Sequence, residues 1–178
     1  MLSEGRFAFD ALRRVRQPAN KLMGFPETKQ GARDASADLE HIRNVMRWEV
    51  LDLEFALLGF DEPPVEADLA LLGEGPAQVI REGGETTLLV RARNVDALLA
   101  RHPGARVQRE LAWIRFLAPM GWEVVGFLAL VTERLARAGV PLGAVCGYSR
   151  DHLFIARPYL ARAREVLSEL FPVDRKRI

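Results

Sequence analysis

Two short stretches of the sequence contain residue types that bind small ligands. The first, Pro119-Met-Gly-Trp-Glu123, precedes a helical pattern, and the free N–H groups of a helix N-terminus can hold a carboxylate or a phosphate. The second, Gly147-Tyr-Ser-Arg-Asp-His152, brings an aromatic ring and two opposite charges into one turn. The predicted ligand site takes residues from both stretches: Pro119, Met120, Gly121, Trp122, Glu123, Gly147, Tyr148 and Asp151.

Simpler interpretations of both stretches stay open. Gly121 could merely permit a turn while Glu123 caps its own helix. The second stretch could be a solvated turn, in which an Arg150–Asp151 pair contributes little.

Familiar signatures of enzymes and metal sites are absent from the sequence. His41, His102 and His152 stand apart, without HxH or HExxH spacing, and no GxSxG or Walker motif occurs. Cys146 is the single cysteine, so the chain forms neither an internal disulfide nor a cysteine zinc cluster. As a nucleophile Cys146 would need a base, for which His152 is the nearest candidate; a small buried strand residue is the alternative. We therefore expect no catalysis, no metal and no cofactor.

The composition is that of an ordinary globular protein. With 178 residues, 49% hydrophobic and 28% charged, the chain can form one domain or two small ones. Its 25 basic and 24 acidic residues leave a net charge of +1, which gives no general attraction to nucleic acid or membrane. No apolar run approaches the roughly 18 residues that span a bilayer. We expect a cytoplasmic protein without nucleic-acid or membrane partners, because a lone cysteine also suits a reducing compartment.

The second half of the chain has the pattern strand, helix, strand, strand, helix. Apolar residues from Val124 to Leu135 recur at i, i+3, i+4, i+7 and i+11, and Gly139 with Pro141 ends this helix. The other expected elements are a strand over 113–118, paired strands over 142–147 and 152–157, and a helix that begins at Pro158.

The first half has a similar rhythm without a residue-level repeat. Gly83-Gly84 supplies the positive φ angles of a tight hairpin, and Pro63-Pro64 ends a buried strand. The expected elements are strand 50–59, helix 65–72, hairpin strands 78–82 and 86–91, helix 95–100 and strand 105–109.

The two ends of the chain are predicted to lie outside the folded units. Residues 1–47 are expected to be a mobile N-terminal extension, because Gly, Pro, Gln, Asn and charged residues dominate residues 16–38. An internal start at Met46 stays possible. Four residues before Trp48 nevertheless have helical spacing: Leu39, Ile42, Val45 and Met46. Residues 173–178 form a short basic tail, expected to be frayed.

A set of residues in the second half matches the pattern of a known family. They are Ala118-Pro119, Gly126, Leu135-Ala136, Ala138-Gly-Val140, Ala144-Val145, Tyr148, Asp151 and Leu153-Phe-Ile155. Looser matches in the first half are Phe55-Ala56, Pro63-Pro64, Gln78-Val-Ile-Arg81 and Thr87-Leu-Leu-Val90. In these positions the chain resembles the ACT domain family related to the arginine sensor CASTOR, in particular its small bacterial tandem members.

The resemblance implies a fold and a function. The fold is α+β, with tandem ACT-like (ferredoxin-like βαββαβ) modules over 48–110 and 111–172, antiparallel sheets and helices on one face. The function is non-enzymatic binding of an amino acid or a similar molecule at module interfaces. Asp151 matches an acidic ligand contact of the family, and Tyr148 matches its hairpin aromatic.

The chain also departs from the family pattern. The family's Asp in the strand-to-helix turn falls on Gly121, its Ser two places later on Glu123, and its Ser-Thr before the Tyr on Cys146-Gly147. These changes remove polar groups from the pocket and weaken the case for arginine as ligand, although Glu123 could replace the lost carboxylate.

Three functional hypotheses follow. The favoured one is a cytoplasmic regulatory protein that binds an amino acid and forms a homodimer or docks on a regulated partner protein. The alternative is a protein-interaction module that has lost its ligand site. The third is a small α/β enzyme that uses Cys146.

Overall fold

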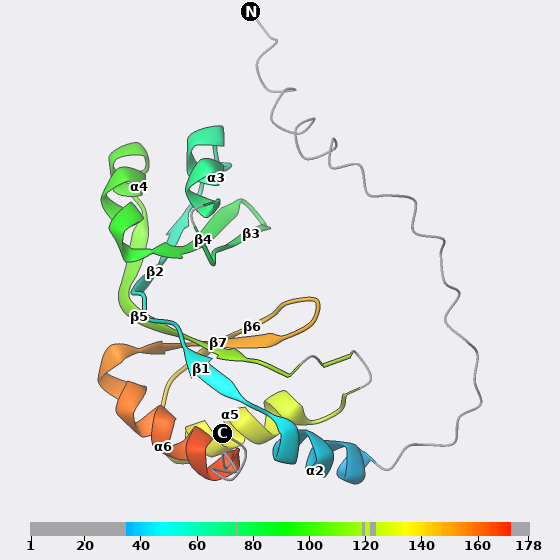
Figure 1. The fold of residues 1–178 in the computed structure, drawn as a ribbon. Helices are drawn as coiled ribbons and strands as arrows, with labels where there is room; N and C mark the ends of the chain where they lie inside the picture. The colour runs from blue at the N-terminus through cyan, green and yellow to red at the C-terminus, as the bar shows by residue number, and fades with distance from the viewer. Residues whose placement is uncertain (1–34, 74, 119, 122–123, 172–178) are drawn as a thin grey trace, which may run out of the picture.

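The computed structural model describes residues 35–73, 75–118, 120–121 and 124–171 (Figure 1). Pro119, Trp122 and Glu123 of the predicted site, the predicted extension up to residue 34 and the predicted basic tail lie outside the described residues. The helices are α2 (Ala35–Val45), α3 (Glu66–Leu72), α4 (Val95–Arg101), α5 (Phe127–Arg137) and α6 (Leu160–Leu170), with 3-10 turns η1 (Ala92–Asn94) and η2 (Arg157–Tyr159). The strands are β1 (Trp48–Val50), β2 (Phe55–Phe60), β3 (Gln78–Glu82), β4 (Glu85–Arg91), β5 (Arg106–Phe116), β6 (Gly143–Cys146) and β7 (Asp151–Ala156).

The strands form one antiparallel sheet that consists of two similar halves. Its order is β3-β4-β2-β5-β7-β6, and β1 also pairs with β5. The first half has the order β5-β2-β4-β3 with α3 and α4, and the second has β1-β5-β7-β6 with α5 and α6. Each half therefore has ferredoxin-like βαββαβ connectivity, completed in the second half by β1. The predicted α+β fold with antiparallel pairing is confirmed.

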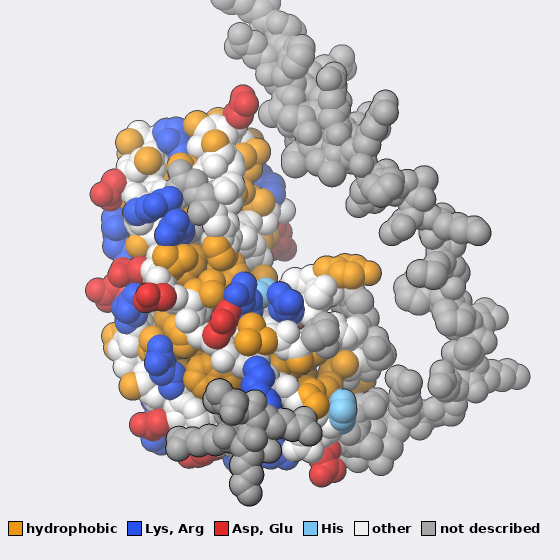
Figure 2. Space-filling model, in the orientation of Figure 1, with side chains coloured by type: hydrophobic (Ala, Val, Ile, Leu, Met, Phe, Trp, Pro, Cys, Tyr) orange, Lys and Arg blue, Asp and Glu red, His pale blue; other side chains and the backbone are white. Residues whose placement is uncertain are grey.

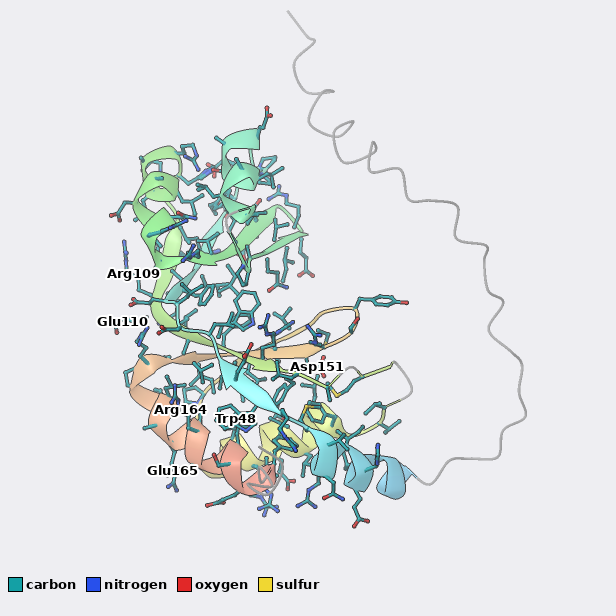
Figure 3. The ribbon with its side chains drawn as sticks, viewed as in Figure 1. Trp48, Arg109, Glu110, Asp151, Arg164 and Glu165 are labelled. Carbon is teal, nitrogen blue, oxygen red and sulfur yellow. The ribbon has the colours of Figure 1, made fainter. Side chains whose placement is uncertain are left out.

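Strand β5 belongs to both halves and bends between them. Its pairing with β2 shifts register between Phe55 and Leu57, where Arg109 and Glu110 of β5 stand opposite the single residue Ala56 and so form a bulge with one extra residue. Glu110 in this bulge has φ 58°, the left-handed region that side chains other than glycine rarely adopt. Figure 3 shows Arg109 and Glu110 at this bend, beyond which β5 runs into the second half.

The helices cover the outer faces of the sheet, α3 and α4 on the first half and α2, α5 and α6 on the second (Figure 1). Each half has its own core beneath its helices. A third cluster joins the two inner faces near β5, and Figure 2 shows apolar side chains gathered where the halves meet. This cluster comprises Phe55, Leu89, Leu111, Trp113 and Phe154.

The hairpin predicted around Gly83-Gly84 is confirmed. Strands β3 and β4 pair from Gln78–Leu89 to Glu82–Glu85, and the two glycines have φ angles of 53° and 105°. Positive φ at both central residues is the geometry of a type I′ turn, which matches the twist of the strands.

Two expectations for the start of the folded region are wrong. Residues 35–45 form α2 instead of a mobile extension, because Ile42 and Met46 insert into the core of the second half, where Met46 is completely buried. The expected single strand over 50–59 is two strands, β1 and β2. The segment between them crosses the bend of β5, so that β1 pairs with Ile114–Phe116 and β2 with Arg106–Leu111.

Candidate functional site

The candidate site lies where the β6–β7 hairpin meets the connection from β5 to α5. The hairpin closes with a two-residue turn, in which the Gly147 N–H donates to the Arg150 carbonyl at 2.7 Å. The Met120 N–H donates to the Ser149 carbonyl at 3.0 Å and so ties the β5–α5 connection to the hairpin tip. A Cβ atom on Gly147 would lie 3.1 Å from the Arg150 carbonyl oxygen and 3.4 Å from His152 Nε2, so this turn needs glycine for its close approach.

A cavity of about 240 Å³ lies between these segments. Five of the eight predicted site residues line it, namely Met120, Gly121, Gly147, Tyr148 and Asp151. The prediction missed seven further lining residues: Val124, Gly126, Phe127, Leu128, Ala129, Cys146 and Arg150. Figure 3 shows Asp151 at the start of β7, on the side of the hairpin that faces α5.

Helix α5 begins later than the sequence predicts, which changes the floor of the site. The helix starts at Phe127, after Gly126 with φ 88°, and not at residues 123–124. The N-terminus of α5 therefore lies after the first predicted stretch, which ends at residue 123. Instead the first turn of α5 contributes Phe127, Leu128 and Ala129, which gives the cavity an apolar floor.

Two opposite charges line the cavity next to this apolar floor. Arg150 and Asp151 are neighbours at the end of the hairpin, and both residues line the cavity. Cys146 pairs directly with Asp151 across the two strands. A hydrogen bond to Asp151, together with slight desolvation of this exposed residue and the nearby negative charge, raises the pKa of the Cys146 thiol. The thiol thus stays protonated at neutral pH, which makes it a poor nucleophile.

The base that a Cys146 nucleophile would need faces away from it. Successive residues of a strand point to opposite faces, and His152 follows Asp151 in β7. The His152 ring packs edge-on against Trp113 on the inner face of the sheet, with 5.5 Å between ring centroids. Burial lowers the pKa of His152, and the nearby Arg115 lowers it further. Cys146 and His152 therefore do not form a catalytic pair. Among the described residues, no three His, Cys, Asp or Glu side chains cluster in a way that could hold a metal ion.

Two other cavities have similar volumes but a different character. One of about 250 Å³ lies between α2, α5 and α6, and the other, of about 280 Å³, lies over β2, β4 and β5. Charged side chains of the solvated surface rim both; in the first, Arg162 pairs with Glu165 at 3.1 Å. Such exposed pairs contribute little free energy. Neither cavity combines an apolar floor with a turn and a connection that are hydrogen-bonded to each other.

Comparisons with known proteins identify the fold. No protein-family model matches the sequence, and no curated protein matches it. Among solved structures, a protein of unknown function from Vibrio cholerae, described as a possible transport protein, is 21% identical with a TM-score of 0.60, over 76% of this chain and 95% of that one. A protein from Agrobacterium tumefaciens is 17% identical with a TM-score of 0.57, over 70% of this chain and 88% of that one.

The regulatory subunit of aspartate kinase from Thermus thermophilus, in a ligand-free form, is also similar. It is 16% identical with a TM-score of 0.51, over 70% of this chain and 96% of that one. The chain thus has the ACT-like, ferredoxin-type α+β fold of aspartate kinase regulatory domains. At these identities the likeness concerns the fold. No helix in the described part of the chain is both long and apolar enough to cross a membrane.

Proposed function

We propose that this chain is a non-enzymatic regulatory protein of the ACT type, which binds an amino acid or a related small molecule in the hairpin cavity. The observation that carries the proposal is the presence of the oppositely charged Arg150 and Asp151 beside an apolar floor in a cavity of about 240 Å³. An α-amino acid has one negative and one positive group beside its side chain, so it matches two opposite charges. The volume lies below the roughly 300–1,000 Å³ of pockets for drug-sized molecules and suits a small ligand.

The arrangement suggests how the ligand is held. The Arg150 guanidinium pairs with the ligand carboxylate, and Asp151 pairs with its amino group, because hydrogen bonds between ionised groups of opposite charge are stronger than neutral ones. The ligand side chain packs on Phe127, Leu128 and Val124. Glycine at 121 and 147 keeps the wall of the cavity free of side chains, which supports close approach of the ligand to the backbone.

Thermal shift and calorimetry with each of the 20 amino acids test the proposal. A ligand at 100 times its dissociation constant stabilises the native state by about 2.7 kcal/mol, which raises the Tm by roughly 5–10 °C. The response is expected to disappear in Asp151→Ala. It should persist in Asp96→Ala, because the Asp96 side chain is 91% exposed and lies in the other half. Silence toward all 20 amino acids in the purified protein would refute the proposal.

A second candidate function is a protein-interaction module without a ligand. The observation that favours it is the exposed hairpin: Tyr148 at its tip is 90% exposed, and β6 is an outer strand of the sheet, with Gly143 and Ala144 exposed. Outer strands present free backbone groups to a partner, here a second copy of the chain or a regulated protein. Sedimentation with and without amino acids separates the two functions. If the chain is an interaction module, wild type should self-associate without any response to amino acids, and Ala144→Pro should lose this self-association. We propose a cytoplasmic location, which a lone cysteine suits.

A further inference from the structure

The two halves of the sheet place different side chains at equivalent positions. Each hairpin has a two-residue turn, Gly83-Gly84 in the first half and Tyr148-Ser149 in the second. Counted outward from the turns, Arg81 corresponds to Cys146 and Thr86 to Asp151. The pairing confirms this correspondence, since Arg81 pairs with Thr86 and Cys146 with Asp151.

In the first half, Arg81 fills the position between the hairpin and the connection to the first helix. Its guanidinium donates to the carbonyl oxygens of Gly84 at 2.6 Å and Asp61 at 3.1 Å, and to Thr86 Oγ1 at 3.0 Å. The Thr86 hydroxyl in turn donates to the Glu62 carbonyl at 2.6 Å. A cation thus bridges the turn, the hairpin strand and the β2–α3 connection.

In the second half, the corresponding side chain is too short to make this bridge. The short Cys146 side chain lies beside Asp151, its partner across the two strands. The Ser149 carbonyl, which corresponds to that of Gly84, accepts from the Met120 N–H instead. The connection to the helix is also longer, ten residues (117–126) against five (61–65). The cavity of about 240 Å³ lies at this place.

The charge at this position also differs between the halves. The first half combines a cationic side chain with the neutral Thr86, whereas the second combines a neutral thiol with the carboxylate of Asp151. At the position of Arg81 the second half therefore has no cation, and at the position of Thr86 it has an acid. A carboxylate in a partly enclosed site is best satisfied by a cation with N–H donors.

We infer that the ligand of the second half presents an ammonium or guanidinium group to Asp151, at the position that the Arg81 guanidinium takes in the first half. The first half holds its own side chain as an internal ligand, so the chain binds one ligand and not two. The inference rests on the proposed function for the site, and it adds the equivalence of the ligand's cationic group with the Arg81 guanidinium and the stoichiometry.

Chemical labelling of Cys146 tests the inference without knowledge of the ligand. Cys146 is the single cysteine and is exposed, so methanethiosulfonate reagents modify it alone: its thiolate displaces methanesulfinate and forms a mixed disulfide. The aminoethyl reagent adds a short cation, and the sulfonatoethyl reagent adds an anion on the same two-carbon chain. We expect the aminoethyl protein to have a Tm about 2 °C or more above that of the sulfonatoethyl protein.

Two controls separate local recognition from a general effect of charge. In Asp151→Asn the difference between the labels should fall to less than half, because the acidic partner is gone. In the double variant Cys146→Ser, Ser168→Cys, the labels lie on an exposed position of α6 and should give nearly equal Tm values. Equal Tm values for the two labels on Cys146, or a higher Tm for the anion, would overturn the inference.

The first half offers an independent test of the internal ligand. Arg81→Ala should lower the Tm, and about 10 mM methylguanidine should restore part of the loss while it leaves wild type unchanged. Absence of this rescue contradicts the role of Arg81 as an internal ligand.

If amino acids bind but the two labels on Cys146 behave alike, the proposed function stands and the cation position is wrong. If the labels differ but all amino acids are silent, the cation site stands and the proposed function is wrong.

Discussion

Replacement of Asp68 by asparagine tests the account of the first half most directly. Asp68 in α3 is completely buried, and three donors surround its carboxylate. The Val65 N–H donates at 2.9 Å, Arg101 Nε donates at 2.7 Å, and His102 Nε2 lies at 2.9 Å. This carboxylate therefore joins the start of α3 to the end of α4. Asparagine has nearly the same shape, so the change removes the charge and one acceptor without creating a cavity.

The expected loss in the free energy of unfolding is about 3 kcal/mol. The lost cap at Val65 contributes about 1 kcal/mol, and the buried His102 left without a charged acceptor contributes about 1–3 kcal/mol. The pair with Arg101 adds less, because that side chain is 31% exposed and solvent weakens the interaction. Urea unfolding followed by circular dichroism at pH 7 measures the difference. Asp96→Asn is the matched control, expected within about 0.5 kcal/mol of wild type. A loss below about 1 kcal/mol for Asp68→Asn would refute the reasoning.

The pH dependence of this difference has a definite sign. Burial raises the pKa of Asp68, but the hydrogen bonds from Val65, His102 and Arg101 outweigh it and leave the pKa below its ordinary value of 3.8. Because the pKa of Asp68 is lower in the folded state than in the unfolded state, its ionised carboxylate gives its full stabilisation at any pH above the unfolded-state pKa. This stabilisation is lost as the pH falls below about 3.8 through the folded pKa. The gap between wild type and Asp68→Asn should therefore be constant near neutrality and narrow below pH 4.

Three further outcomes are expected. Glu110→Gly should keep or raise stability by up to about 1 kcal/mol, because it relieves the positive φ, whereas Glu110→Val should lower it by about 1–2 kcal/mol in thermal unfolding. Gly147→Ala should lower stability by about 1–2 kcal/mol and weaken any amino-acid response, while Gly104→Ala, where a Cβ meets nothing within 4 Å, should be nearly neutral by the same assays. His152 should titrate below 6.5 by NMR, because burial and the nearby Arg115 lower its pKa in the folded state. The free energy of unfolding should therefore decrease as the pH falls below 6.5. A titration at or above 6.5 would contradict the burial of His152 beside Arg115.

The parts of the fold that the sequence predicts well are the local ones. The β3–β4 hairpin depends on two adjacent glycines, and α5 depends on apolar residues such as Val131 and Leu135, which are both buried. The place of β1 could not be predicted in this way. Its three residues pair with Ile114–Phe116, more than 60 positions away, and the sequence around residue 50 does not reveal which half they join. The same holds for α2, whose order depends on the core that Ile42 and Met46 enter.

In the candidate site, too, the sequence predicts residues of one local segment and misses those that α5 contributes. Gly147, Tyr148 and Asp151 lie in one hairpin, so short-range pattern brings them together. Phe127 and Leu128 were missed because the helix was expected to begin a turn earlier, where their side chains would serve only as core. The left-handed Gly126 delays the helix and turns its first residues toward the hairpin. An isolated glycine in a helical pattern was the available signal, since glycine often marks such a break.

The two halves show why no residue-level repeat is visible although the pairing pattern recurs. In each half the closing helix ends in a residue with nearly the same backbone angles, His102 in the first and Phe171 in the second. His102 stacks on Phe60, with 3.8 Å between ring centroids, and Phe171 packs edge-on against Phe116 at 5.9 Å. The shared backbone pairing keeps this contact between the end of the helix and an aromatic ring of the sheet in both halves, while the type of side chain that makes it differs. In the first half, His102 contacts the buried carboxylate of Asp68. In the second half, Asp151 occupies the position that Thr86 has in the first. Each half therefore satisfies the same geometry by different means, one with charges supplied internally and the other with a charge left for a ligand.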